Sequence, residues 1–251
     1  METLLNKTND FFNECYKTSW MRGNDFDISY RQIQPIKYIG NMAYLYIKYD
    51  RPQTTREFFE KYTSDKTELT SVGKHGLTEN EWLKLAKQYY SYSTPKYNIP
   101  FEYYCQNLLY RQFYQTIEGH KKEEMILNYI NKQYPSFTAS TVDGVTDLEY
   151  GVDIEVKSND NPIFYIQVKP ITFLFGNTKK DLIQDRKNLF DKNNKLDNKV
   201  YIVYYKHNDE NDIELMTNNK NKILFNTNTF IKENGISFFD IYDTNYTWKK
   251  L

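Results

Sequence analysis

Cysteine and histidine are scarce in this sequence. The chain of 251 residues has two cysteines, Cys15 and Cys105, and three histidines, none of which has the spacing of a zinc site. A fold of this size does not need disulfides, and so few cysteines exclude a disulfide-rich scaffold. We therefore expect reduced thiols, as in the cytoplasm.

Long apolar runs and an excess of either charge are also missing. The first residues, METLLNKTNDFF, lack the basic flank and apolar core of a signal peptide, and no later run is apolar over the length of a membrane span. The 33 basic and 33 acidic residues cancel, so no overall positive field indicates a nucleic-acid partner, although local patches can still bind phosphate. The sequence predicts a cytoplasmic protein without a membrane segment.

Aromatic side chains are plentiful, with 24 Tyr and 16 Phe in a chain whose apolar and charged content is ordinary for a globular protein. The first part of the chain has the signals of helices. Thr54 precedes Glu57 by three residues, and Thr78 precedes Glu81 by three, which is the spacing of capping boxes ahead of amphipathic runs. Helices are therefore expected to begin at these two threonines.

Two further helices are expected, over 101–119 and 119–134, and Pro135 ends the second. From residue 137 the pattern changes to the alternation of strands, with a helix expected over 178–192 before the last strand. The expected strands are 137–141, 151–156, 162–170 and 200–206.

This order predicts an α/β protein with a mixed β-sheet flanked by helices, preceded by a mainly helical N-terminal half. Antiparallel strands come first, and the helical crossover to the last strand gives a parallel pair. Because the sequence has no repeat and no linker, residues 1–118 and 119–251 are expected to be two regions of one continuous domain.

The strands over 151–156 and 162–170 carry polar residues among apolar ones. Asp153 lies on the first, and Gln167 and Lys169 lie on one face of the second. The connecting SNDNP favours a turn, so the strands are expected to pair antiparallel and to bring these three side chains together. A strand with one solvated face explains the same alternation, so the pattern by itself is weak evidence for a site.

An acid at the start of one strand, a residue-x-lysine near the end of the next, and the helix and strand that follow resemble the PD-(D/E)XK nuclease superfamily over less than half of the chain. In this resemblance Asp153 is the metal-binding acid, Lys169 is the motif lysine, and Gln167 replaces the usual second carboxylate. Members of the superfamily often have a glutamate on the preceding helix, and here either Glu123 or Glu124 matches it. The resemblance implies a restriction-endonuclease-like core.

The resemblance also implies Mg²⁺-dependent hydrolysis of a phosphodiester. Asp153, Gln167 and Glu123 would hold Mg²⁺ through oxygen atoms, which this hard cation prefers, and Lys169 would orient or deprotonate water. Because Gln167 brings no charge, cation binding is expected to depend more strongly on Glu123.

A second placement of the motif lies in the same stretch. Glu155 and Lys157 also form an E-x-K, and Asp143 or Asp147 would supply its acid. In this placement the helical crossover does not follow the motif strand, whereas it does follow Lys169. We therefore expect the site at Asp153, Gln167 and Lys169.

Two groups of basic residues in the N-terminal half are candidates for contacts with DNA. Arg31, Lys37 and Arg51 are interleaved with aromatic residues, whereas Lys74 and His75 lie in the glycine-flanked loop VGKHG. A packed element with a solvated face explains the same pattern equally well. The segment RPQTTREFFEKY ahead of a tryptophan-containing helix is similar to MjaI-type restriction enzymes.

Together these resemblances imply a type II restriction endonuclease that cuts double-stranded DNA and leaves 5′-phosphate and 3′-hydroxyl ends. Such an enzyme is expected to be a homodimer when its target is a palindrome, and a DNA methyltransferase is expected as its genetic partner. Two alternatives stay open. One is a structure-selective repair or recombination nuclease, and the other is a catalytically inactive nucleic-acid-binding module of the same fold.

Overall fold

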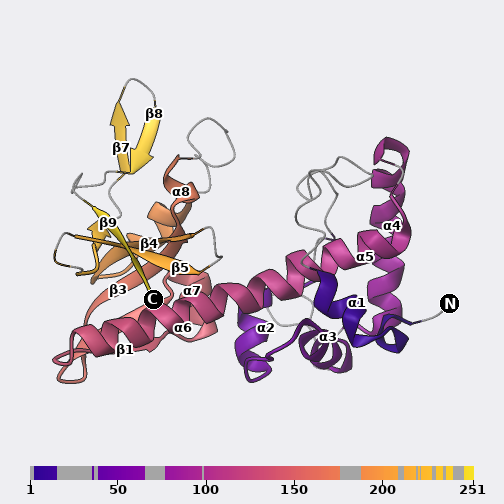
Figure 1. Cartoon of the computed structure of the whole chain (residues 1–251), viewed down its shortest axis with the longest axis horizontal. Helices are drawn as coiled ribbons and strands as arrows, with labels where there is room; N and C mark the ends of the chain where they lie inside the picture. Colours follow the sequence, from indigo (N-terminus) through magenta and orange to yellow (C-terminus); the bar gives the residue numbers. More distant parts are fainter. Residues whose placement is uncertain are drawn as a thin grey trace. The chain divides into compact units, whose positions relative to one another are not determined.

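The computed structural model of the chain forms two compact units, Met1–His120 and Lys121–Leu251 (Figure 1). Cys15 and Cys105 are both buried, and neither forms a disulfide within the described part of the chain. No helix among the described residues has the length and apolar character to cross a membrane. The structure describes residues 3–15, 36, 39–65, 77–97, 99–175, 188–208, 212–218, 220, 222–227, 230–233, 236–239 and 246–251.

The first unit is helical, and both predicted helix starts are confirmed. The Thr54 hydroxyl accepts a hydrogen bond from the backbone N–H of Glu57 at 3.1 Å. Thr78 and Glu81 form a reciprocal capping box, with bonds of 3.3 and 2.8 Å. The elements of this unit are η1 (Leu4–Asn6), α1 (Asn9–Asn13), α2 (Met42–Lys48), α3 (Thr55–Ser64), α4 (Glu79–Tyr97) and α5 (Phe101–Leu109).

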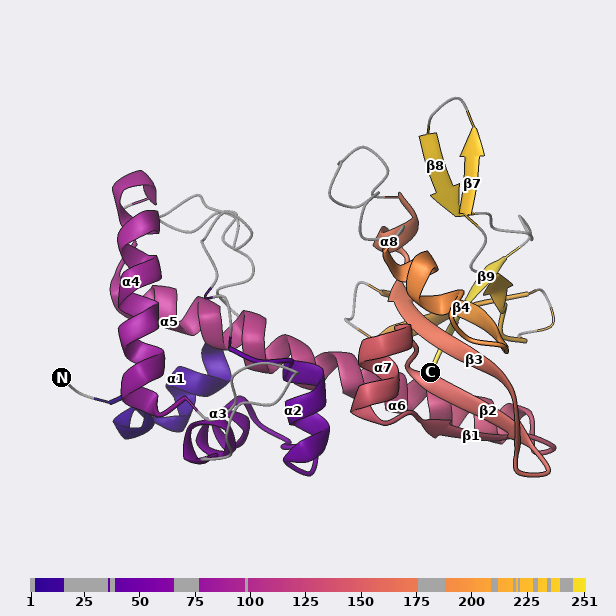
Figure 2. The same cartoon turned by 180° about the vertical axis from the view of Figure 1, so that it is seen from behind.

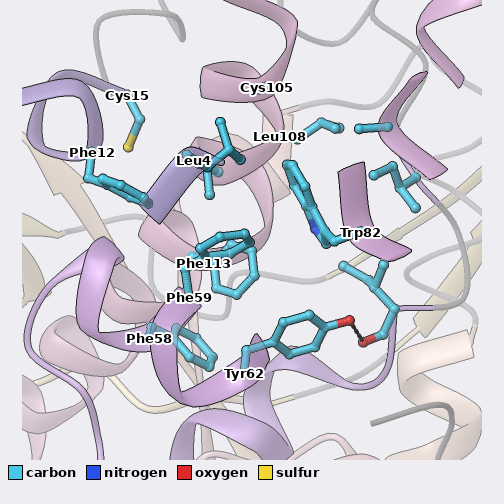
Figure 3. Packing of buried hydrophobic residues seen from close by; sticks show 14 of the residues in the cluster. Leu4, Phe12, Cys15, Phe58, Phe59, Tyr62, Trp82, Cys105, Leu108 and Phe113 are labelled. Carbon is cyan, nitrogen blue, oxygen red and sulfur yellow. Dashed lines mark hydrogen bonds between the residues drawn. The ribbon is translucent and has the colours of Figure 1, made fainter. Parts of the chain in front are cut away.

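Aromatic rings fill the core of the first unit (Figure 3). Phe113 stands edge-on to Phe58, Phe59 and Tyr62, with ring centroids 5.1, 5.4 and 5.4 Å apart, and Phe59 meets Trp82 in the same way at 5.2 Å. Edge-to-face pairs place the positive rim of one ring against the negative face of another, which adds to the free energy gained by burial. Packing therefore accounts for part of the aromatic content of the sequence.

One helix replaces the two that were expected over 101–119 and 119–134. α5 passes into a π-helical segment, Tyr110–Tyr114, and then into α6 (Gln115–Gln133), without a break at Gly119. The expected break is wrong because a single glycine costs a helix only about 1 kcal/mol, and good helix formers on both sides outweigh that cost. The helix ends at Gln133, two residues before Pro135, as expected.

The second unit is built on a mixed β-sheet, so the α/β expectation is confirmed (Figure 2). Its strands run in the order β1-β2-β3-β4-β5-β9, with β6 also paired to β4, and β3 and β4 are parallel while the other pairs are antiparallel. The strands that match the prediction are β1 (Thr138–Thr141), β2 (Ile154–Ser158), β3 (Asn161–Pro170) and β4 (Lys199–His207).

The later strands and two short helices were not predicted. Of the helix expected over 178–192, residues 188–192 are helical, the helix continues to residue 193, and the earlier residues lie outside the described part of the chain. The unpredicted elements are α7 (Gly144–Tyr150), α8 (Thr172–Phe175), β5 (Ile213–Thr217), β6 (Asn226–Thr227), β7 (Phe230–Glu233), β8 (Ile236–Phe239) and β9 (Thr247–Lys250); among the described residues β7 and β8 form a separate two-stranded sheet.

The two faces of the sheet are covered differently. Ile126 and Ile130 of α6 pack on one face, whereas Ile202 and Tyr204 of β4 belong to a smaller cluster on the other face. The buried sheet residues that join α6 in its cluster are Ala139, Ile154, Val156, Ile166, Val168, Val203 and Leu215. The alternation of β2, β3 and β4 between these faces fixes where their polar side chains lie.

The outer edge of β1 is closed by a side chain of α6. Asn131 accepts a hydrogen bond from the backbone N–H of Ala139 at 2.7 Å and donates one to the carbonyl of the same residue at 3.0 Å. Its amide thus takes the place that a neighbouring strand would have.

The unpredicted helix α7 is fixed at both ends. Asp143 caps its start by accepting two backbone N–H bonds, both of 2.9 Å. Gly151 follows its end in the left-handed conformation, φ 65°, and an added Cβ there would lie 2.8 Å from Leu189. The buried amide of Asn193 donates to the carbonyl of Gly151 at 3.3 Å and to that of the residue before it at 2.6 Å.

Candidate functional site

Pairing between β2 and β3 brings Asp153 opposite Gln167. Ile154 is paired with Ile166, and the backbone N–H of Asp153 donates to the Ile166 carbonyl at 2.9 Å. The Asp153 carboxylate oxygen Oδ2 in turn accepts a bond of 2.6 Å from the backbone N–H of Val168. The main chain therefore holds the carboxylate against β3 near its C-terminal end, as the predicted hairpin requires.

Gln167 and Lys169 lie on one face of β3, beside Ile202 and Tyr204 of the parallel strand β4. The Gln167 side chain is 2% exposed, and its carbonyl oxygen Oε1 is buried without a hydrogen-bond partner. A buried polar atom without a partner costs about 1–3 kcal/mol, so folds rarely keep one without a use. The ammonium of Lys169 lies 6.0 Å from the centre of the Phe173 ring and, within the described residues, forms no salt bridge.

Several charges act on Asp153. Burial raises the pKa of its carboxyl well above the ordinary value, the negative charge of Glu123 raises this pKa further, and Lys169 opposes them. Asp147 of α7 adds a smaller effect in the same direction as Glu123. Asp153 precedes the first residue of β2, so charges from α6, α7 and β3 all reach it at this end of the sheet.

The structure separates the two candidate glutamates of α6. Glu123 is the one whose charge acts on Asp153, and it is partly buried, whereas Glu124 is exposed. Glu123 comes from the helix that packs on the opposite face from Gln167 and Lys169. The predicted residues therefore meet around Asp153 from two sides of the sheet.

The residues of the second placement of the motif make other contacts. Glu155 pairs with Lys157 at 2.7 Å and accepts a bond of 3.1 Å from the hydroxyl of Tyr165. Asp143 caps α7, where backbone N–H bonds hold the pKa of its carboxyl below the ordinary value. Asp147 acts on Asp153 instead.

Most of the candidate DNA contacts lie outside the described residues: Arg31, Lys37, Lys74 and His75. Arg51 is described, and it is exposed in a turn where its own φ is 48° and that of Asp50 is 59°. Its position at the surface allows a contact with a ligand. Nothing in the structure directs it toward one.

A divalent cation fits the donor set at Asp153 in part. Among the described residues no group of three or more His, Cys, Asp or Glu side chains is placed to hold a metal ion. The set here has two carboxylates and an amide, and the unpaired Oε1 of Gln167 is the kind of hard oxygen that Mg²⁺ accepts. A cation beside Asp153 would also offset the repulsion from Glu123.

Two residues act on the site in ways that the sequence did not predict. Asp147 was considered only as an acid of the second placement; it belongs to α7, whose start the D-x-x-T spacing of Asp143 and Thr146 was able to indicate as a cap. Tyr205 of β4 is near Glu123 and Asp153, whose charges act on it, and no sequence signal distinguishes it from the chain's many other tyrosines.

Comparison with known proteins adds no relative: no family model, no curated protein and no solved structure matches the chain. The candidate site therefore stands on the geometry of this structure.

Proposed function

We propose that the protein is a Mg²⁺-dependent DNA endonuclease with a restriction-endonuclease-like core, most simply a type II restriction enzyme. The observation that carries the proposal is the position of the Gln167 carbonyl oxygen: it is buried, has no partner among the described residues, and lies opposite Asp153, whereas the similarly unpaired amides of Asn107 and Gln112 belong to the first unit. Lys169 lies two residues further on the same strand face, and Glu123 acts on Asp153 from α6. Together these residues supply oxygen ligands for Mg²⁺ and, in Lys169, a positively charged side chain close to them. Metal-dependent hydrolysis of a phosphodiester uses groups of both kinds.

Each residue has a distinct part in the proposed reaction. Asp153, Gln167 and Glu123 would hold Mg²⁺, which supplies positive charge for the phosphate and acidifies bound water. Lys169 would donate to the developing oxyanion or take the proton of the attacking water. Attack of the water on phosphorus would break the bond between phosphorus and the 3′-oxygen, so the products would have 5′-phosphate and 3′-hydroxyl ends.

The remaining parts of the proposal concern partners. Double-stranded DNA is the proposed substrate, the helical first unit would contribute recognition, and a homodimer would match a palindromic target. A DNA methyltransferase would protect the host's own copies of that target.

The test is cleavage of supercoiled plasmid in Mg²⁺ by the full chain. We expect discrete fragments, and we expect Asp153→Ala and Lys169→Ala each to lose cleavage by at least a hundredfold while the protein stays folded. The matched control is Glu155→Ala with Lys157→Ala, on the neighbouring ion pair, which should cut normally. Near-normal cutting by either site variant, or loss only in the control, would refute the placement.

The two alternatives give different outcomes in the same assay. Preferential cutting of branched or flapped DNA would indicate a repair or recombination nuclease. DNA binding without cleavage under any divalent cation would indicate an inactive module.

A further inference from the structure

A tyrosine of β4 lies beside the candidate site with its hydroxyl uncommitted. Tyr205 is paired with Pro170, the residue after Lys169, and its own carbonyl accepts a bond of 2.7 Å from the backbone N–H of Ile171. These backbone contacts fix Tyr205 at the end of β3 where the candidate site lies.

The ring of Tyr205 is held from α6. The ammonium of Lys122 lies 5.7 Å from the ring centre, and Lys122 directly precedes Glu123. The ring also stands edge-on to His207 at 5.9 Å. Contact with the residue next to Glu123 places the phenol on the Glu123 side of Asp153.

The chemistry of this phenol is that of a donor. A phenol has an ordinary pKa of about 10, so the Tyr205 hydroxyl carries its proton at neutral pH and can donate a hydrogen bond. The charges of Glu123 and Asp153 both act on this hydroxyl, which places it near them. The hydroxyl forms no hydrogen bond within the described part of the chain. A protonated, unpaired donor beside two acids suits an anionic oxygen that arrives with a ligand.

We propose that Tyr205 is a substrate-binding residue of this site, whose hydroxyl donates a hydrogen bond to a non-bridging phosphate oxygen of the DNA. The inference rests on the proposed function, because the phosphate must lie beside the cation held at Asp153. Tyr205 would then hold the phosphate from the α6 face of the sheet, on the side of Glu123.

The test compares Tyr205→Phe with Tyr201→Phe in the full chain. Tyr201 lies four residues earlier on the same strand, so it has the same face, and its ring packs edge-on to Phe164 at 5.3 Å, in another part of the sheet. DNA binding is measured by fluorescence anisotropy in Ca²⁺, cleavage by plasmid cutting in Mg²⁺, and folding by the melting temperature.

A hydrogen bond to a charged oxygen is worth about 1.5–3 kcal/mol, so Tyr205→Phe should weaken DNA binding roughly tenfold to a hundredfold and raise KM with little change in kcat. Its melting temperature should stay that of the wild type, and Tyr201→Phe should bind and cut normally.

Other outcomes separate this inference from the proposed function. Binding by Tyr205→Phe equal to that by Tyr201→Phe overturns the role of Tyr205, and so does a lowered melting temperature without weaker binding. If the wild type binds DNA but cuts none, the proposed function fails, and the anisotropy comparison still decides the role of Tyr205. If the wild type binds no DNA, both fail.

Discussion

Asp153 occupies a position that favours its protonated form. In the unfolded chain its pKa is about 4, and in the fold burial and Glu123 raise it well above that value. As pH rises from about 4 toward the raised pKa, the unfolded chain loses its proton first, so the free energy of unfolding falls through this interval. Above the interval the ionised carboxylate is a constant cost to the fold.

We therefore predict that Asp153→Asn stabilises the protein at pH 8 and has little effect near pH 4. The gain should be on the order of 1 kcal/mol, because functional sites commonly reduce stability by this amount and the amide carbonyl can still accept the Val168 bond. Urea unfolding at both pH values, without divalent cations, measures it. A difference between the two proteins that does not change with pH would contradict the assignment of the raised pKa to Asp153.

Gln167 allows a second prediction. Gln167→Leu removes the unpaired buried oxygen at similar side-chain volume, so it should raise the free energy of unfolding in chelator by about 1 kcal/mol. It should also abolish the stabilisation that Mg²⁺ gives the wild type, because a ligand that binds only the folded state stabilises it. Urea unfolding with and without Mg²⁺ measures both effects.

Asn193 provides the contrast to Gln167. It is equally an amide in the interior, but its side chain donates to two carbonyls, so Asn193→Leu should destabilise the fold. If Gln167→Leu destabilises to the same extent, Gln167 has an unseen structural partner and is not a ligand.

At the residue scale the sequence predicted which polar side chains gather, and it did not predict the face of the sheet from which Glu123 comes. The alternation of β2 and β3 was sufficient to bring together Asp153, Gln167 and Lys169. The position of Glu123 depends on how α6 packs across the sheet, which periodicity within a single helix does not contain. The same limit hid Tyr205, since its neighbours come from α6 and from the start of β2.

At the scale of elements, the side chain of Asn131 replaces a strand. Asn131→Ala should lower the free energy of unfolding by about 1–2 kcal/mol, because it leaves the N–H and the carbonyl of Ala139 without their partner. It should also promote self-association, since the exposed edge of β1 can pair with another chain. Urea unfolding and light scattering measure the two effects. Asn128→Ala, at an exposed position one turn earlier on α6, should change neither.

The uninterrupted helix gives a prediction at Gly119. Gly119→Ala should raise the free energy of unfolding by about 0.5–1 kcal/mol, because alanine favours helix and an added Cβ meets nothing within 4 Å. Gly151→Ala should do the opposite, since Gly151 has φ 65° and its Cβ would press on Leu189. Thermal unfolding of the two variants tests both expectations. If Gly119→Ala does not stabilise the protein, the helix is broken at Gly119.

Local signals explain which elements were predictable. The capping boxes at Thr54 and Thr78 and the alternation of the first four strands are contained in a few adjacent residues, and they were confirmed. β5 and β9 are short, and β9 is also polar; they are strands because each pairs with a neighbouring strand. α7 depends on contacts with residues 188–193, more than forty positions away.

At the scale of the whole molecule, the two units have separate hydrophobic cores. Phe113→Ala should cost about 3–5 kcal/mol, because it removes a ring that three others contact. Hydrogen exchange should show the loss of protection concentrated within residues 1–120. Phe164→Ala, in the aromatic cluster of the second unit, should show the reverse distribution. Equal loss throughout the chain for both variants would mean that the units unfold as one.

The single parallel contact of the described sheet, between β3 and β4, determines when the candidate site is completed during folding. β1, β2 and β3 are close in the sequence and can pair early. β4 can pair with β3 only after residues 171–198 bring the two strands together, and this step is slow because the connecting chain loses conformational entropy before the strand contacts form. Asp153, Gln167 and Lys169 are on the early strands, and Tyr205 is on the late one. A newly made chain would thus have Asp153, Gln167 and Lys169 in place before Tyr205 arrives, so the step that pairs β4 with β3 is also the step that completes the site.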